Sequence, residues 1–533
     1  MSSTDLPNLR DWISRRLPFA NNNNVAGKRS WDRAAVARLG AILLIMVLAV
    51  GLRVWELGQV GFNTDEAVYS GQAAAIAGAP ILKDIFPIFR AHPLLFHVIL
   101  SLVFHFGVSD VAGRLVAVAI GLATVYFAYL LGSLLYGKNA GLLAALILAI
   151  MPYQVVVSRQ VLLDGPMVFF STLTLYLLAR FANSGRGAWL HAVGVGMGLT
   201  FLAKETGIIL LAAIYAFLAL SREIRIRIID LAISTALVVL MVAPYPLSLI
   251  LGGGTRSGQQ YLLWQLFRRA NHPWDFYLLT VPPSIGILVI IIGLLGLWLL
   301  RRENTWRERL LLCWILVPVI FFDLWPTKGF QYLLPIAPPF AVLAARTFTL
   351  WNPGKNFRIL GRQLNIALIR AVIVAIMVLT LLIPSLQVIR PATTGTFVAG
   401  TGGVPGGREA GEWIRDHIPT GATMLTIGPS MANILEFYGY RTAYGLSISP
   451  NPLRRNPSYQ AIINPDLQIR NGDLQYVVWD SYSAERSSFF SNGLLKFTKR
   501  YHGRVIYVES VMVPSADGTT VAKPVIIIYE VRP

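Results

Sequence analysis

Two adjacent carboxylates, Asp65 and Glu66, follow directly after the first long apolar run, in the stretch FNTDEAVYSGQ. An acidic side chain can serve as a general base or as a ligand for a divalent cation. Asn63 stands three residues before Glu66, which is the spacing of a helix capping box. Glu66 therefore has a structural explanation at the start of a helix, and Asp65 is the stronger candidate for chemistry.

Further ionisable residues gather in the polar loops between apolar runs. Asp164, in SRQVLLDGP, is a third candidate catalytic group beside Asp65 and Glu66. Cations hold phosphate groups, and carboxylates serve as bases or metal ligands, so this mixture predicts an anionic substrate. The candidate substrate-binding residues are Lys83, Arg159, Lys204, Arg268, Arg269, His272, Lys328 and Tyr332.

Several of these residues also have a purely structural interpretation. Asp164 precedes Gly-Pro and can start the next helix. Lys204 can extend its ammonium group to the membrane surface. Arg268 and Arg269 can form a solvated charged pair, and His272 can be an ordinary interfacial histidine. Both interpretations stay open on the sequence alone.

Composition identifies the class of protein that must position these groups. Of the 533 residues, 55% are hydrophobic and 14% are charged. Continuously apolar runs of about 18 residues recur through the first three quarters, which predicts a polytopic α-helical membrane protein. The net charge of +19 lies mainly in the N-terminal arm and in short loops. That distribution indicates membrane orientation rather than a nucleic-acid partner. The single Cys313 excludes an intrachain disulfide and a cysteine metal cluster.

The basic loops predict the topology. Residues 1–38 form a basic, disordered arm on the cytoplasmic side. The segment 92–106 is too short to span and carries three histidines. If it lies along the membrane surface, the basic loops between later runs all fall inside, which favours this arrangement. The prediction is about eleven transmembrane helices within 39–389. The basic loops are 221–227, 301–309 and 352–362.

Counting these transmembrane helices from a cytoplasmic N-terminus assigns the polar loops to the extracytoplasmic face. After a linker at 390–407, the tail to residue 533 alternates helix-like and strand-like stretches. We expect a small extracytoplasmic α/β domain there. Its expected strands are TMLTIG, LQYVVWD, GRVIYVESVMV and PVIIIYEV, and its first helix is EAGEWIRDHI. The expected outer loops are 58–110, 158–165, 251–279 and 326–331.

A series of motifs over about residues 60–345 resembles the GT-C fold membrane glycosyltransferases, in particular the protein O-mannosyltransferases and the aminoarabinose transferases that modify lipid A. The motifs occur in the family's order, and AHPLL lacks the second proline of the family pattern. They are FNTDEAVYSGQAAAIAG, AHPLLFHVIL, RLVAVAIGLATVYFAYLLGSLLYGKNAGLLAALILAIMP, SRQVLLDGPMVFF, GLTFLAKETG, HPWDFYLL and KGFQYLLPIAPPFAVLAA.

This resemblance implies an inverting glycosyltransferase of the cell membrane, with a polyprenyl-phosphate sugar as donor and a lipid, glycan or protein as acceptor. By position, Asp65 matches the family's catalytic acidic residue and would serve as base or metal ligand, Glu66 matches its neighbour, and Asp164 matches the second acidic loop. Lys204 and the basic residues of 251–279 match positions that hold the donor phosphate. Members differ in metal dependence, so Mg²⁺ or Mn²⁺ at Asp65 and Asp164 is optional.

Three other functions compete with this interpretation. An oligosaccharyltransferase of the same fold would carry a Trp-Trp-Asp-Tyr-Gly motif, of which VVWDSYS is only a fragment. A transporter or flippase for lipid-linked sugars would show inverted repeats, and the sequence has no convincing internal repeat. A non-catalytic assembly subunit that kept the fold is the third alternative.

Overall fold

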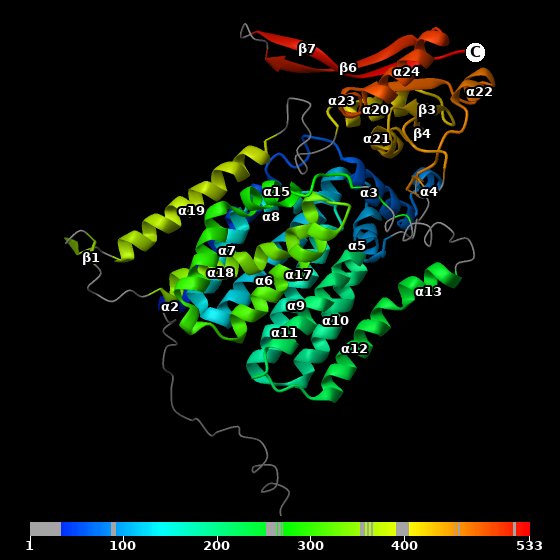
Figure 1. The fold of residues 1–533 in the computed structure, drawn as a ribbon. Helices are drawn as coiled ribbons and strands as arrows, with labels where there is room; N and C mark the ends of the chain where they lie inside the picture. The colour runs from blue at the N-terminus through cyan, green and yellow to red at the C-terminus, as the bar shows by residue number, and fades with distance from the viewer. Residues whose placement is uncertain are drawn as a thin grey trace, which may run out of the picture. The chain divides into compact units, whose positions relative to one another are not determined.

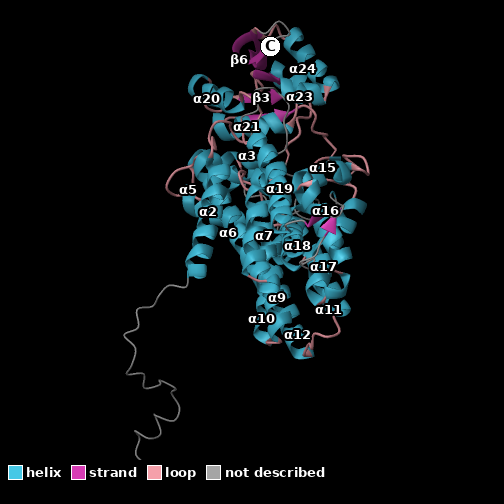
Figure 2. Cartoon of the chain, turned by 90° about the vertical axis from the view of Figure 1, so that its left-hand side faces the viewer, coloured by secondary structure: helices cyan, strands magenta, loops and turns pink. Residues whose placement is uncertain are grey.

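The computed structural model is mostly helical and carries a five-stranded sheet near the C-terminus (Figure 1 and Figure 2). Residues 42–533 form one compact unit. Most of the predicted arm and linker lies outside the described residues, as does Arg269. The structure describes residues 33–86, 92–251, 264, 268, 270–351, 358–359, 362–363, 366–390, 404–451, 454–456, 459–514 and 519–533.

Six helical segments of the described chain are long and apolar enough to cross a membrane. A seventh candidate is a pair bent by 90°, α15 (Phe276–Ile285) and α16 (Ile287–Leu299). The prediction of a polytopic helical membrane protein is confirmed at this level. The six segments are α2 (Arg33–Val54), α6 (Asp110–Tyr136), α9 (Asp164–Ser184), α12 (Ile228–Val242) with α13 (Pro244–Leu251), η3 (Phe330–Ile336) with α18 (Ala337–Leu350), and α19 (Ile366–Val388).

Shorter helices complete the bundle, and all of them except η1 and η2 share one buried apolar core with the long ones. The core also holds an ion pair, in which Arg346 Nε of α18 donates to Glu308 Oε1 at 2.6 Å. Arg346 is fully buried, so the carboxylate offsets an otherwise costly charge. The shorter helices are α7 (Lys138–Ile150), α8 (Pro152–Val157), α10 (Gly187–Ala203), η1 (Glu205–Ile208), α11 (Ile209–Leu220), η2 (Arg301–Glu303) and α17 (Trp306–Leu324).

Three helices follow the first long helix before α6 begins. In α3 (Thr64–Ile76), Asn63 and Glu66 form the predicted capping box, with both reciprocal hydrogen bonds present. After α4 (Pro80–Ile85) comes α5 (Leu95–Phe104), which has 10 residues. Ten residues rise about 15 Å, so α5 is too short to span a hydrocarbon core.

The C-terminal sheet has the strand order β4-β3-β5-β7-β6. Strand β3 pairs in parallel with β4 and β5, whereas β7 pairs antiparallel with β5 and β6. The four predicted strands and the first helix are confirmed, and the short β4 was missed. The elements are α20 (Gly407–His417), β3 (Thr423–Thr426), α21 (Pro429–Gly439), β4 (Thr442–Gly445), α22 (Pro465–Arg470), β5 (Tyr476–Asp480), α23 (Ser481–Arg486), α24 (Ser488–Arg500), β6 (Arg504–Pro514) and β7 (Thr520–Glu530). Two further short strands, β1 (Arg358–Ile359) and β2 (Arg362–Gln363), pair with each other.

The sheet region packs directly on α3. Phe62 and Ala67 lie in the same buried cluster as Ile414 of α20 and Ile434 of α21. Both views show α3 and the sheet at one end of the bundle, and the connection between α11 and α12 at the other (Figure 1 and Figure 2). The basic connection 221–227 therefore lies far from Asp65.

Close approach of α6 and α7 depends on two glycines. A Cβ atom on Gly132 would lie 3.0 Å from the Cα atom of Gly141, and one on Gly141 would press on the backbone of Tyr129 and Ser133. We expect Gly141→Leu to lower the free energy of unfolding by about 1–3 kcal/mol or more, because backbone atoms cannot move aside as a flexible side chain can. Thermal unfolding in detergent measures this change. Gly40→Leu is the matched control, since its Cβ meets nothing within 4 Å; an equal loss in both variants would contradict the argument.

Candidate active site

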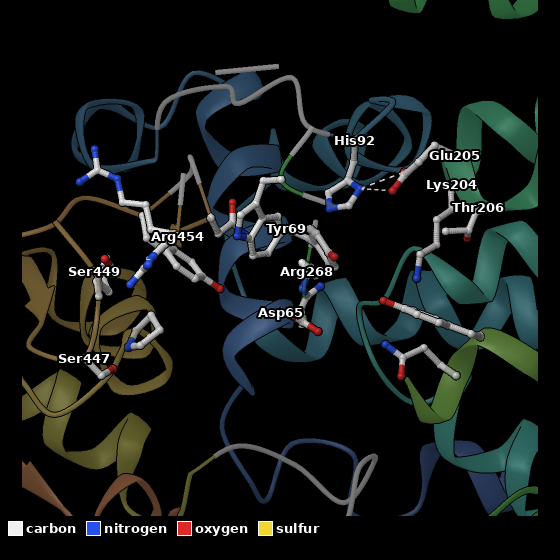
Figure 3. A pocket seen from close by; sticks show the side chains of 18 residues that line it. Asp65, Tyr69, His92, Lys204, Glu205, Thr206, Arg268, Ser447, Ser449 and Arg454 are labelled. Carbon is white, nitrogen blue, oxygen red and sulfur yellow. Dashed lines mark hydrogen bonds and ion pairs between the residues drawn. The ribbon is translucent and has the colours of Figure 1, made fainter. Parts of the chain in front are cut away.

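A polar cavity of about 430 Å³ opens beside the start of α3 (Figure 3). Its wall combines residues of the helical bundle with residues that follow β4. Acidic, basic and aromatic side chains are all present, as predicted for an anionic substrate. The lining residues are Asp65, Tyr69, His92, Lys204, Glu205, Thr206, Trp264, Arg268, Gln331, Tyr332, Pro429, Ser447, Ile448, Ser449, Arg454, Arg455, Asn456 and Tyr459.

Asp65 lies at the boundary between this cavity and a second one. The second cavity has a volume of about 300 Å³, and it includes Asn63, Gln160 and Phe330 in its wall. Tyr459 lines both cavities together with Asp65. A group at such a boundary can reach one molecule in each cavity at the same time.

The Asp65 side chain is exposed to the two cavities, and many protein atoms of the cavity walls lie close around it. This burial raises the pKa of Asp65, because the charged form loses solvation. The nearby Lys204 ammonium partly opposes the increase, whereas Asp164 adds to it. A raised pKa makes a carboxylate a stronger base, which suits proton abstraction from a hydroxyl group.

Glu66 has a different role from its neighbour. It is fully buried, and its two carboxylate oxygens accept from Nε and Nη2 of Arg114 at 2.8 Å each. The backbone N–H of Val161 also donates to Glu66. These partners, together with the capping box, use the carboxylate for structure and connect α3 to α6 and to the chain before α9.

Arg114 also fixes the loop that leads into α3. Its Nη1 and Nη2 atoms donate to the carbonyl groups of Leu57, Val60 and Gly61 at 2.6–2.9 Å. One guanidinium group thus satisfies the loop carbonyls and the Glu66 carboxylate. The position of Asp65 follows from these bonds, because the loop and the first helical turn are held together.

Two residues of the sheet region hold the same loop from the other side. Arg408 Nη1 donates to the carbonyl of Gly58 at 2.7 Å and to Asp110 Oδ2 at 3.0 Å. The hydroxyl of Tyr438 accepts from the backbone N–H of Phe62 at 2.8 Å and donates to Asp110 at 3.1 Å. The segment before Asp65 is therefore held between the bundle and the sheet region.

Asp164 and Lys204 form a buried ion pair. Lys204 Nζ donates to both oxygens of Asp164 at 2.8 Å, and it lies 4.7 Å from the centroid of the Tyr332 ring. Lys204 is only 5% exposed, so the alternative that it extends to the membrane surface is wrong. Lys204 and Tyr332 both line the larger cavity, and Figure 3 shows Lys204 on the cavity wall.

His92 and Glu205 form a second pair on the cavity wall, with His92 Nδ1 2.9 Å from Glu205 Oε2. In the same wall, the Arg268 guanidinium lies 4.5 Å from the centroid of the Trp264 ring. Arg268 is one of the predicted binding residues, whereas His92 and Glu205 are not. A signal was present in the sequence, because His92 and Glu205 both lie in polar segments between apolar runs, where a histidine and a carboxylate can meet.

Four predicted binding residues are absent from the described linings of both cavities. Lys83 is exposed on α4. Arg159 donates to backbone carbonyls of α2, and Lys328 Nζ donates to the carbonyl of Asp323. The ring of His272 stacks on Phe276 with a centroid distance of 4.0 Å. Arg159, Lys328 and His272 were predicted to bind substrate, and each of these side chains contacts another part of the protein outside the two cavities.

The side chains available as metal ligands do not favour a metal ion at Asp65 and Asp164. Among the described residues, no group of three or more His, Cys, Asp or Glu side chains could hold a metal ion. Both oxygens of Asp164 already accept from the Lys204 ammonium group, which supplies the positive charge there. These residues therefore do not fit a shared divalent ion in this arrangement.

Loss of the Arg114 guanidinium tests its role in the site. We expect Arg114→Met to lower the free energy of unfolding by about 3–5 kcal/mol, because Glu66 would remain as an unpaired buried charge. Chemical unfolding of the purified protein in detergent measures this. The double variant Glu66→Gln with Arg114→Met should recover part of the loss, as expected for a coupled pair; purely additive losses would contradict the coupling.

Comparison with known proteins supports the same fold. A family model described as dolichyl-phosphate-mannose-protein mannosyltransferase matches residues 91–245. The chain is 26% identical over 226 residues to an undecaprenyl phosphate-alpha-4-amino-4-deoxy-L-arabinose arabinosyl transferase of Pectobacterium carotovorum, covering 40% of each protein. The match thus spans less than half of that relative.

Solved structures resemble nearly the whole chain. ArnT from Cupriavidus metallidurans bound to undecaprenyl phosphate has a TM-score of 0.66 at 14% identity, covering 92% of this chain and 98% of that one. The oligosaccharyltransferase AglB from Archaeoglobus fulgidus, in complex with an inhibitory peptide and a dolichol-phosphate, has a TM-score of 0.53 at 13% identity, covering 93% and 75%. Another structure of the archaeal protein contains zinc and sulfate. The predicted fold is confirmed: the chain has the GT-C fold of these solved structures.

Proposed function

We propose that this protein is a membrane glycosyltransferase that moves a sugar from a polyprenyl-phosphate donor to an acceptor hydroxyl group. The observation that carries the proposal is the place of Asp65, an accessible carboxylate of raised pKa between two cavities. The fold shared with ArnT, which binds undecaprenyl phosphate, supports a lipid-linked donor. The acceptor molecule is a lipid, a glycan or a protein.

The larger cavity suits the phosphate and sugar of the donor. Lys204 and Arg268 supply positive charge, and the Tyr332 hydroxyl can donate a hydrogen bond to a phosphate oxygen. The fixed Asp164–Lys204 pair keeps the ammonium group in one position, so little reorganisation is needed when phosphate binds. The lipid tail would extend from this cavity along the helical bundle.

The smaller cavity would hold the acceptor hydroxyl. Asp65 takes its proton as the acceptor oxygen bonds to the anomeric carbon of the sugar. The bond from that carbon to the phosphate oxygen breaks, and polyprenyl phosphate leaves with the electron pair. Cations in the larger cavity stabilise the departing phosphate. Attack from the side opposite the leaving group inverts the anomeric configuration.

We further propose the topology that the sequence predicted. Residues 39–389 form the membrane domain with about eleven transmembrane helices, and 390–533 form an extracytoplasmic α/β domain. The separation of the basic 221–227 connection from Asp65 supports a cytoplasmic N-terminus and an outward-facing site. The plasma membrane is the proposed location.

Replacement of the carboxylate by an amide tests the base. We expect Asp65→Asn to reduce sugar transfer by about 10²–10⁴-fold, because the amide cannot accept the proton. The assay uses purified full-length protein and a radiolabelled polyprenyl-phosphate sugar. Donor binding and thermal unfolding should stay near wild-type values, since Glu66 and Arg114 still fix the loop. Unchanged transfer would eliminate Asp65 as base, and lipid movement without sugar release would indicate a flippase.

The pH profile of the same assay supplies the control. Only the ionised carboxylate accepts a proton, so activity should fall as the pH decreases through the pKa of Asp65. Because burial raises that pKa, the acid limb should lie above the usual aspartate range. The residual activity of Asp65→Asn should lack this limb.

Accessibility to an impermeant thiol reagent tests the topology. We expect Asn304→Cys, in the basic 301–309 loop, to remain unlabelled in intact cells, because that loop is assigned to the cytoplasm. Asp416→Cys, on the exposed face of α20, should be labelled. Wild type controls for Cys313, which is buried. Labelling of residue 304 from outside would reverse the assigned orientation.

A further inference from the structure

One side of the larger cavity comes from the chain after β4. This C-terminal wall comprises Ser447, Ile448, Ser449, Arg454, Arg455, Asn456 and Tyr459. In Figure 3, Ser447, Ser449 and Arg454 lie on the side opposite Lys204 and Glu205, with Asp65 and Arg268 between them. The cavity therefore has cations on two opposite sides, Lys204 on the bundle side and Arg454 on the C-terminal wall, and Asp65 and Arg268 lie between them.

The two groups differ in how their charge is balanced. On the bundle side, Lys204 is paired with Asp164, and Glu205 with His92. On the C-terminal wall, neither Arg454 nor Arg455 forms an ion pair with a carboxylate in the described part of the chain. The Arg455 side chain makes a long contact of 3.5 Å with the carbonyl of Pro450. Their positive charge thus remains available to a molecule in the cavity.

Two adjacent guanidinium groups in one cavity repel each other until an anion lies near both. The planar donors of arginine match the two oxygens of a carboxylate or phosphate, and the hydroxyls of Ser447 and Ser449 can add hydrogen bonds. A cationic amino group would instead meet like charge. The wall is therefore selective for charge.

We infer that the C-terminal wall is an oxyanion subsite, which binds a carboxylate or phosphate group of a substrate and disfavours a cationic amino sugar. This inference rests on the proposed transfer function and extends it to the class of substrate. The oxyanion has two possible sources. It is either an acidic group on the donor sugar or an acidic group on the acceptor.

The first measurement compares donors that differ only in charge. Polyprenyl phosphates carrying a hexuronic acid, the matching neutral hexose, or an amino sugar bind to full-length protein in nanodiscs. If the sugar supplies the oxyanion, wild type binds the uronic acid donor most tightly. Arg454→Gln with Arg455→Gln should weaken that binding about tenfold or more and leave the neutral donor unchanged. The corresponding lysine double variant keeps the charge and should retain part of the affinity.

The second measurement detects an acceptor-side oxyanion without any transfer. Polyprenyl phosphate without sugar first saturates the bundle-side cations, and inorganic phosphate is then titrated while the melting temperature is recorded. Wild type should show a further, saturable increase in melting temperature, and the glutamine double variant should not. A positive result here with equal binding of the three donors assigns the oxyanion to the acceptor.

Arg415→Gln is the matched control, because Arg415 is exposed on α20 and lies outside the described lining of the cavity. The inference is overturned if the glutamine double variant behaves as Arg415→Gln does in both measurements, or if wild type binds the amino-sugar donor most tightly. Asp65→Asn separates this outcome from failure of the proposed function. It should lose transfer and keep both anion effects, whereas a protein without transferase activity would show no transfer in any variant.

Discussion

The buried ion pair between Glu66 and Arg114 is the constraint on which the site depends. Arg114 neutralises Glu66 and at the same time satisfies the carbonyl groups of the loop at 57–61. A buried pair of this kind contributes little net stability, but loss of either partner is costly. It therefore specifies one conformation of the loop. Asp65 is the neighbour of Glu66 in the first turn of α3, so this conformation sets where its carboxylate points.

The same principle explains the pattern of charges elsewhere. Asp164–Lys204 and Glu308–Arg346 are both buried pairs within a bundle whose environment penalises isolated charge. The Glu308 pair joins α17 to α18 and does not line either cavity. The Asp164 pair differs because its ammonium group borders the larger cavity. A structural pair at the edge of a cavity becomes a fixed electrostatic environment for a substrate.

Contacts between residues close together in the sequence could be predicted, whereas contacts between distant residues could not. The Asn63–Glu66 capping box was predicted correctly because both residues lie in one helical turn. The cluster of Asp65, Asp164 and Lys204 at one end of the bundle followed from the count of membrane spans, which assigned their loops to the same side of the membrane. The partner of Glu66 was missed, although Arg114 stands inside an apolar run, where a charge usually needs a buried partner. Arg159, His272 and Lys328 were grouped with the substrate-binding cations but lie outside both cavity linings, since composition cannot reveal a nearby carbonyl or ring.

The contribution of the tail could not be predicted, because its contacts to the site cross more than 300 residues of sequence. Arg408 and Tyr438 hold the loop before Asp65, and the C-terminal wall closes the cavity beside the same residue. The helical bundle alone would therefore present Asp65 on an incompletely fixed loop in an open cavity. In the proposed transfer reaction, the positioning of Asp65 and the binding of substrate at the C-terminal wall would both depend on the packing between α3 and the sheet region. On the proposed mechanism, a change in the C-terminal wall that leaves Arg408 and Tyr438 in place would alter substrate choice, whereas a change at those two residues would disturb the loop before Asp65 and lower turnover with every substrate.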